Sequence, residues 1–394
     1  MSEKNRQKPA GPLDGLKVVD LTRMLPGPFG TMLLADLGAD VIVVEQPSGP
    51  ALGPRRKNFY VDRNKRSMAL NLKDERARKI LYRLVADADV FVEGFRPGVT
   101  ERLEIDYPTL KRTNPGLIYC SISGYGQDGP DRLRVGHDLN YAATAGLLHL
   151  NGRKDTGPVI FATQVSDIAG GGMLSAFSIM AALYHRQQTG NGQHIDVSMT
   201  DGALALNPLA FLEYSNAGKA PVRQGYRNLG ATPCYNIYRT KDDEYITIGA
   251  LEPKFWATLC RLLDREDLID RKEDTSGETV ETLQSIFATR TRAEWDRLLD
   301  DKEVCYAPVL DMEEVCSNRQ YVYRKMIHEE IDVDGTRSVQ AGVVPRFSMT
   351  PGTLRRLPSR PGQHSREILS EQGLDQSTID NLEKEGVVKS NTDA

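Results

Sequence analysis

GLKVVDLTRMLPGPFGTMLLADLGADVIVVE, at residues 15–45, contains two β-branched runs separated by a loop and an apolar segment of helix length. The runs at 16–21 and 40–45 predict strands, and the segment 30–37 between them predicts a helix that ends at Gly38. A strand, a helix and a second strand in this order pair in parallel through a right-handed crossover. This stretch therefore predicts the beginning of an α/β sheet.

The same alternation continues through the N-terminal half of the chain. Further strands are predicted at 68–72, 89–93, 117–122 and 193–198, and helices at 73–88, 139–150 and 167–187. Strands that alternate with helices form a doubly wound parallel sheet, so we expect a large Rossmann-like domain. The glycines at 170–172 indicate that another backbone approaches the last helix closely, because glycine has no side chain to obstruct it.

The sequence changes character after residue 204. The polar segment 205–231 predicts a linker. Strands at 235–239 and 245–250, a helix that starts at Pro253 and a helical pattern at 280–300 predict a smaller α+β domain over 232–325. Residues 1–204 then form the N-terminal part of the large α/β domain, and 326–394, with an amphipathic helix pair between 360 and 388, return to complete it.

Composition narrows the possible partners and compartments. The 394 residues carry 50 Lys and Arg against 54 Asp and Glu, a net charge of −4, so no basic field favours nucleic acid or a membrane surface. The uncharged stretch 168–184 is shorter than the roughly 20 residues of a spanning helix and predicts a buried helix instead. We therefore expect no nucleic-acid partner and no membrane partner.

Five widely spaced cysteines without a CxxC pair indicate a reducing compartment and neither a zinc site nor a disulfide framework. The opening MSEKNRQKPA lacks the apolar run of a secretory signal. We expect a cytoplasmic protein, with a mitochondrial or peroxisomal location open for a eukaryotic source.

Familiar catalytic motifs are missing: the chain contains no GxGxxG, P-loop, HExxH or GxSxG pattern, so a classical NAD site is not expected. His137 lies in GHD after a Gly- and Pro-rich loop, and Asp138 and Asp167 are each placed to cap a helix. At a helix N-terminus Asp167 should stay ionised and can act as a base or nucleophile. Glu252 begins a helix before Pro253. Each of these residues also has an ordinary structural explanation, so only their combination is informative.

Long blocks in fixed order give the chain a resemblance to a known family. RNKRSMALNLK (63–73), DVFVEGFRPGVTERL (89–103), NPGLIYCSISGYGQDGP (114–130) and QTGNGQHIDVSMTDG (188–202) resemble the family III CoA-transferases of CaiB/BaiF type, as does the opening stretch. Within that family, GHDLNY (136–141), SDIAGGGM (166–173) and the stretch 231–256 resemble the α-methylacyl-CoA racemases. The resemblance implies a Rossmann-like large domain, a smaller α+β domain and a homodimer of two interlocked chains.

For the site, the resemblance implies that His137 and Asp167 are the two catalytic bases and that Glu252 lies beside His137. Tyr235 would lie near that pair, and Asp138 would support the loop. In an interlocked dimer, His137 and Asp167 would come from one subunit and Glu252 from its partner.

The resemblance also implies positions that contact CoA. Arg63, Lys73, Arg96 and Arg102 match basic positions near CoA in the family. Racemases often place an arginine after the second strand, where this chain has Gln46, so a phosphate contact at that position is in doubt.

Three functions remain open. A 2-methylacyl-CoA racemase would move the α-proton between His137 and Asp167, with the helix start near Asp167 offering N–H donors to the enolate oxygen. An acyl-CoA:carboxylate CoA-transferase would use Asp167 as nucleophile and leave His137 and Glu252 without a role. The third is an acyl-CoA-binding protein without activity. None of these functions requires a metal or redox cofactor, because CoA is part of the substrate. The acyl chain of that substrate stays open.

Overall fold

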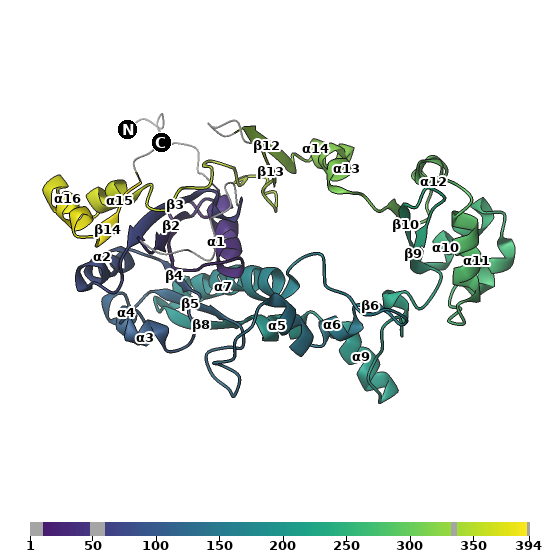
Figure 1. Cartoon of the computed structure of the whole chain (residues 1–394), viewed down its shortest axis with the longest axis horizontal. Helices are drawn as coiled ribbons and strands as arrows, with labels where there is room; N and C mark the ends of the chain where they lie inside the picture. The colour runs from purple at the N-terminus through teal and green to yellow at the C-terminus, as the bar shows by residue number, and fades with distance from the viewer. Residues whose placement is uncertain (1–10, 48–59, 332–336, 392–394) are drawn as a thin grey trace. The chain divides into compact units, whose positions relative to one another are not determined.

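A computed structural model describes residues 11–47, 60–331 and 337–391 (Figure 1). The described chain forms two compact units. The first contains residues from 11–145, 162–206 and 325–391, and the second contains 146–161 and 207–324. Both ends of the chain thus contribute to the first unit.

A seven-stranded sheet forms the centre of the first unit, in the order β14-β3-β2-β1-β4-β5-β8. All neighbours pair in parallel except β14, which is antiparallel to β3. The strands are β1 (Lys17–Asp20), β2 (Asp40–Glu45), β3 (Lys65–Leu70), β4 (Val90–Glu93), β5 (Ile118–Ser123), β8 (Gln193–Ser198) and β14 (Val388–Lys389). Strands β2 and β3 lie on one side of β1, and β4, β5 and β8 lie on the other, so the strand order switches between β1 and β4. Doubly wound sheets bind ligands at this switch point.

Alternating side chains of the strands bury two separate cores. Val18, Val90 and Ile118 pack on one face with α1 (Pro26–Asp36) and α7 (Leu174–Thr189). Their neighbours in sequence face the opposite side, where they pack with α2 (Glu75–Ala86), α4 (Tyr107–Thr113), α15 (Ser365–Glu371) and α16 (Gln376–Lys384). The prediction of a large parallel-sheet domain is confirmed, and helices on both faces explain why a central strand such as β4 is buried on both sides.

Several predicted boundaries were wrong. The third strand occupies 65–70 and not 68–72, and α1 starts at Pro26, since proline is well suited to a first helical turn. The return segment contains a hairpin, β12 (Ile327–Ile331) with β13 (Arg337–Ala341), which was not predicted.

The glycine-rich segment allows three elements to pack closely. The π-helical segment η2 (Ser166–Met173) continues directly into α7. A Cβ on Gly172 would lie 2.7 Å from the carbonyl oxygen of Pro26 in α1, and one on Gly170 would lie 2.8 Å from that of Met199 in α8 (Met199–Ala205). The predicted close approach of another backbone is therefore confirmed, and it occurs on two sides.

One described helix, Ser166–Thr189, is long and apolar enough to cross a membrane by length and composition alone. Half of the most apolar stretch of this helix is buried inside the first unit, as in the core helix of a globular protein. The other side exposes Met173, Phe177, Met180 and Tyr184 at helical spacing.

The second unit contains a three-stranded antiparallel sheet in the order β11-β10-β9. Its strands are β9 (Tyr235–Arg239), β10 (Tyr245–Gly249) and β11 (Tyr306–Pro308), and its principal helices are α10 (Pro253–Leu262), α11 (Glu278–Phe287) and α12 (Arg292–Leu299). Trp256, Leu283 and Trp295 are fully buried between them. The predicted helical pattern at 280–300 is thus two helices, because Thr291 caps a new one.

The predicted linker and the helix at 139–150 also differ from the structure. The segment 205–231 includes α9 (Pro208–Ala217) and a 3₁₀ turn (Arg227–Leu229), and from residue 207 onward it belongs to the second unit. The helix predicted at 139–150 is broken into α5 (Asp138–Thr144) and α6 (Leu147–Leu150) by Gly146, which has φ 78°. Glycine adopts left-handed backbone without strain, and Gly146 is the residue at which the chain passes from the first unit to the second.

Candidate active site

The helix α5 begins beside His137. His137 has extended backbone (φ −130°, ψ 176°) and occupies the N-cap position, so the helix starts at Asp138. The Asn140 side chain accepts a hydrogen bond from the His137 backbone N–H at 3.0 Å, which holds the turn. The His137 side chain is exposed and available to a ligand. The prediction that Asp138 caps its own helix is wrong, since His137 holds that position.

The Asp138 carboxylate instead joins two helix starts. One oxygen, Oδ1, accepts hydrogen bonds from the backbone N–H groups of Ser166 (2.7 Å) and Asp167 (3.0 Å) at the beginning of η2. A carboxylate at this place satisfies donors that have no partner within the helix and complements its positive end. The residue next to His137 therefore fastens the residue that carries the second candidate base.

Asp167 is the second residue of η2 and not its N-cap, contrary to prediction. Burial raises the pKa of its carboxyl to about 7, and the negative charge of Asp138 adds to the effect. The prediction that the helix terminus keeps this group ionised is therefore wrong, because desolvation outweighs the helix dipole. The first-turn N–H groups proposed as enolate donors are also already bonded to Asp138.

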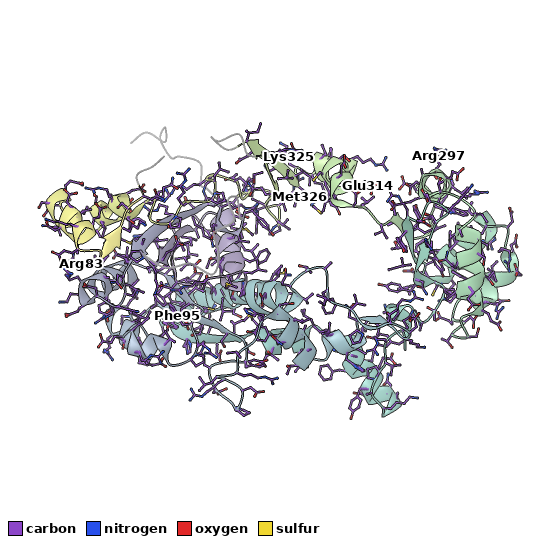
Figure 2. All side chains as sticks on the ribbon, viewed as in Figure 1. Arg83, Phe95, Arg297, Glu314, Lys325 and Met326 are labelled. Carbon is purple, nitrogen blue, oxygen red and sulfur yellow. The ribbon has the colours of Figure 1, made fainter. Side chains whose placement is uncertain are left out.

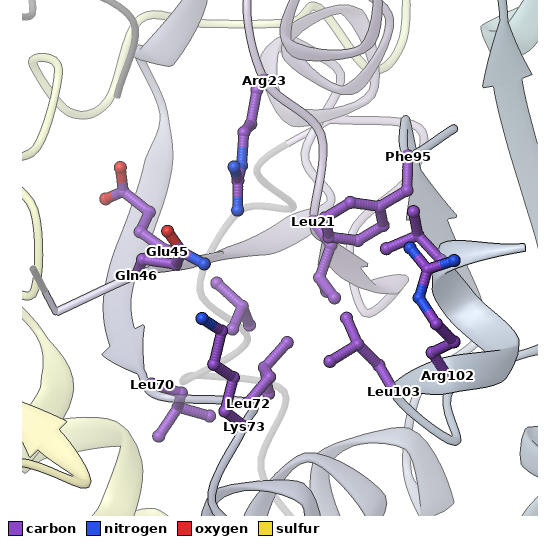
Figure 3. Close-up of a pocket in the computed structure, with 12 residues that line it drawn as sticks. Leu21, Arg23, Glu45, Gln46, Leu70, Leu72, Lys73, Phe95, Arg102 and Leu103 are labelled. Atoms are coloured by element: carbon purple, nitrogen blue, oxygen red, sulfur yellow. The ribbon is translucent and has the colours of Figure 1, made fainter. Parts of the chain in front are cut away.

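A cavity of about 340 Å³ lies at the carboxyl edge of the same sheet (Figure 3). Its wall includes residues at the carboxyl ends of β2 and β3 and residues that follow β1, β2, β3 and β4. Phe95, labelled in Figures 2 and 3, follows β4 and forms part of the apolar wall. Because η2 and α7 run antiparallel to the strands, the start of η2 with Asp167 faces this same edge of the sheet.

Three cations reach the cavity from different elements. Arg23 follows β1, Lys73 precedes α2, and Arg102 ends α3 (Val99–Arg102). All three side chains are exposed, and none forms an ion pair within the part of the chain that the structure describes. Glu45 is the acidic residue of the lining, and Ser67 donates a hydrogen bond to it. The cavity is thus suited to an anionic ligand with an apolar portion.

The amino-acid sequence matches the model of CoA-transferase family III over residues 13–365. The chain belongs to this family. It is 35% identical over 388 residues to alpha-methylacyl-CoA racemase from Homo sapiens, covering 96% of this chain and 98% of the relative. It is 33% identical over 397 residues to succinyl-CoA:glutarate CoA-transferase from Mus musculus, covering 96% and 90%. A CaiB/BaiF family protein from Brucella suis has a similar structure, with a TM-score of 0.79, 30% identity and coverage of 92% of this chain and 100% of that one.

Two of the four CoA positions carried over from family III line the cavity, namely Lys73 and Arg102. Arg63 does not, and the prediction of a CoA contact there is wrong. Its side chain is 2% exposed and forms a 2.6 Å ion pair with Asp36, and it donates to the carbonyl of Ala341 as well. A guanidinium buried in this way fastens the return segment of the chain to α1 and has no donor directed to solvent.

Arg96 lies outside the cavity lining as well. Its guanidinium donates a 3.2 Å hydrogen bond to the carbonyl of Leu133, in the loop that leads to His137. It also lowers the pKa of Tyr141 in α5 against the stronger raising effect of burial. The structure thus connects Arg96 to the loop of the candidate histidine.

Arg23 was not predicted as a site residue of this family III enzyme. The available signal was its position directly after the first strand, where doubly wound sheets bind ligands. The loop after this strand lacks the GxGxxG pattern, and no other motif in it singles out the arginine.

Tyr235 and Glu252 both lie in the second unit, at one end of its sheet. Tyr235 pairs with Gly249, three residues before Glu252, and Glu252 is the N-cap of α10 as predicted. Both side chains are exposed. Within this unit, Cys305 lies near Glu252, whose charge helps burial to raise the pKa of the thiol.

Proposed function

We propose that this enzyme is an α-methylacyl-CoA racemase that inverts the 2-methyl centre of acyl-CoA thioesters. The observation that carries the proposal is the pair of hydrogen bonds that the Asp138 carboxylate accepts from the backbone N–H groups at the start of η2. It joins the turn that bears His137 to the turn that bears Asp167. Two groups able to exchange protons thus belong to one rigid junction at the ligand-binding edge of the sheet.

The chemistry requires a proton to leave one face of the α-carbon and another to arrive on the opposite face. The neutral imidazole of His137 removes the α-proton, the C–H electron pair passes into the thioester enolate, and the protonated carboxyl of Asp167 returns a proton to the other face. The reverse direction exchanges the two roles. Substrate and product have the same composition, so no oxidant, reductant or metal enters the balance.

The environment of Asp167 supports proton transfer. With a pKa of about 7, its carboxyl holds a proton in roughly half of the molecules at neutral pH and releases it readily. A nucleophile that attacks a thioester must be ionised, so the same environment favours transferase chemistry less.

Transferase chemistry is the second candidate, because the similar relatives include a CoA-transferase at nearly the same identity. The two reactions leave different traces. A racemase in deuterated water incorporates deuterium at the α-carbon and produces both epimers from one. A transferase moves CoA to a carboxylate such as succinate and forms an aspartyl intermediate that hydroxylamine traps.

The experiment incubates each single epimer of a 2-methylacyl-CoA with the enzyme in deuterated water and follows exchange by NMR. His137→Gln should reduce epimerisation about 10²- to 10⁴-fold, whereas His185→Gln, at another exposed histidine of the first unit, should match wild type. Absence of α-exchange in wild type together with CoA transfer to a carboxylate would overturn the racemase assignment. Wild-type exchange rates in the His137 variant would exclude this residue as a base.

We also propose that the active enzyme is an interlocked homodimer in which Glu252 of one chain completes the site of the other. The exposed apolar stripe on α7, with Phe177 71% exposed, supports an association that covers it.

Co-expression of differently tagged His137→Gln and Glu252→Gln chains, followed by tandem purification, tests this arrangement. If the site is shared, each heterodimer contains one intact site and recovers about half of wild-type activity. If each chain holds a complete site, no intact site forms and the heterodimer is inactive.

A further inference from the structure

Position 46 is a glutamine where the resemblance to the racemases implies an arginine after the second strand. Gln46 lines the cavity and can donate a neutral hydrogen bond, but it has no charge to offer a phosphate. Its neighbour Glu45 lines the same wall with a carboxylate. A phosphate on this side of the cavity therefore needs its positive charge from a residue other than Gln46.

Arg23 supplies a cation at this place. It follows the adjacent strand β1, and Figure 3 shows its side chain extending into the cavity above Gln46, with Lys73 pointing toward it from below. Within the described chain its guanidinium has no acidic partner. No described carboxylate therefore neutralises this charge, and it is available to an anion.

A cation–π contact of the side chain and a hydrogen bond of the neighbouring backbone hold Arg23 in this position. Its guanidinium carbon lies 5.4 Å from the centre of the Phe95 ring, a cation–π contact. The backbone N–H of Phe95 donates to the buried carboxyl of Glu93 at 2.7 Å, so the ring belongs to a fixed turn. Directly before Arg23, the backbone N–H of Thr22 donates to the buried Asp20 at 2.8 Å and holds the end of β1.

We propose that Arg23 takes over the phosphate contact that Gln46 cannot make, and that it binds a phosphate of the nucleotide end of CoA. Arginine matches phosphate through two parallel N–H donors, which a lysine or glutamine does not provide. Together with Lys73 and Arg102 it places three cations around the cavity against the single carboxylate of Glu45. The inference depends on the proposed function only in taking CoA as the ligand, not in the racemase chemistry.

The test compares free CoA with pantetheine, which has the same thiol arm without the nucleotide. Isothermal titration of the whole enzyme should show that Arg23→Gln weakens CoA binding about ten-fold or more and leaves pantetheine binding unchanged. Lys79→Gln is the matched control, because Lys79 is an exposed cation of α2 that pairs with Glu75 outside the cavity. It should leave both affinities unchanged.

A second variant distinguishes the loss of the positive charge from a change in the structure of the cavity. The double variant Arg23→Gln, Gln46→Arg should recover most of the lost CoA affinity, because it moves the cation to the neighbouring strand end. Equal weakening of CoA and pantetheine in Arg23→Gln, unchanged CoA affinity, or no recovery in the double variant would overturn the inference. If wild type binds no CoA at all, the proposed function fails instead, and the two failures are thereby distinguished.

Discussion

Replacing Asp167 by asparagine should stabilise the folded chain, and more so at high pH. The side chain keeps its shape but loses its charge. In wild type the pKa of this carboxyl is about 7, above its ordinary 3.8, because burial and Asp138 disfavour the charged form. The folded chain therefore holds this proton more tightly than the unfolded chain, and folding stability falls as pH rises through about 7.

The size of the effect follows from the pKa difference. A change of one in pKa corresponds to about 1.4 kcal/mol, so the ionised carboxyl costs about 4 kcal/mol at pH 9 and about 2 kcal/mol at pH 5 relative to a neutral group. The difference between the two pH values is thus about 2 to 3 kcal/mol as an upper bound. Partial solvent contact of the side chain screens the effect, and about 1 to 3 kcal/mol is expected.

Urea unfolding at pH 5 and pH 9, followed by far-UV circular dichroism, measures this growth. Tryptophan fluorescence records the second unit separately, because Trp256 and Trp295 both lie there. Asp201→Asn is the matched control: this carboxylate also lies in the first turn of a helix but is exposed, so its variant should show no comparable growth. An Asp167→Asn gain that is equal at both pH values, or larger at pH 5, would refute the raised pKa and the reasoning built on it.

Three further outcomes are expected. Asp138→Ala should lower the free energy of unfolding by about 1 kcal/mol, as for a lost helix cap, and reduce kcat more than it changes KM, measured by urea unfolding and epimerisation; an unaltered kcat would separate this carboxylate from the site. Arg63→Met should lower the free energy of unfolding by about 3 kcal/mol or more, because it leaves the buried Asp36 without its cationic partner. The folded fraction should bind CoA with wild-type affinity in a titration, and weakened binding would support the CoA contact predicted at Arg63. Arg96→Ala should reduce kcat and leave the Kd of free CoA unchanged, because its bond to Leu133 holds the loop of the histidine; a raised Kd with normal kcat would indicate a phosphate contact instead.

The sequence by itself determined the parallel sheet and the residues worth examining. Period-two and period-3.6 patterns are local properties, so strands such as 40–45 and 193–198 were predicted at their observed bounds. Helix starts depend on local backbone chemistry too, which is why Pro253 marked the beginning of α10. His137, Asp138 and Asp167 could be selected because the surrounding motifs are contiguous in the chain.

Only the tertiary structure decided what those residues do to one another. Asp138 and Asp167 each read as a local cap, yet Asp138 bonds to a helix start 28 residues away. The pKa of Asp167 depends on burial, which no local pattern contains. Likewise, Arg63 and Arg23 are both surface cations by sequence, but one is buried against Asp36 and the other lines the cavity. Charge and hydrogen bonding act across space, so the electrostatics of the site follow from the fold and not from the order of residues along the chain.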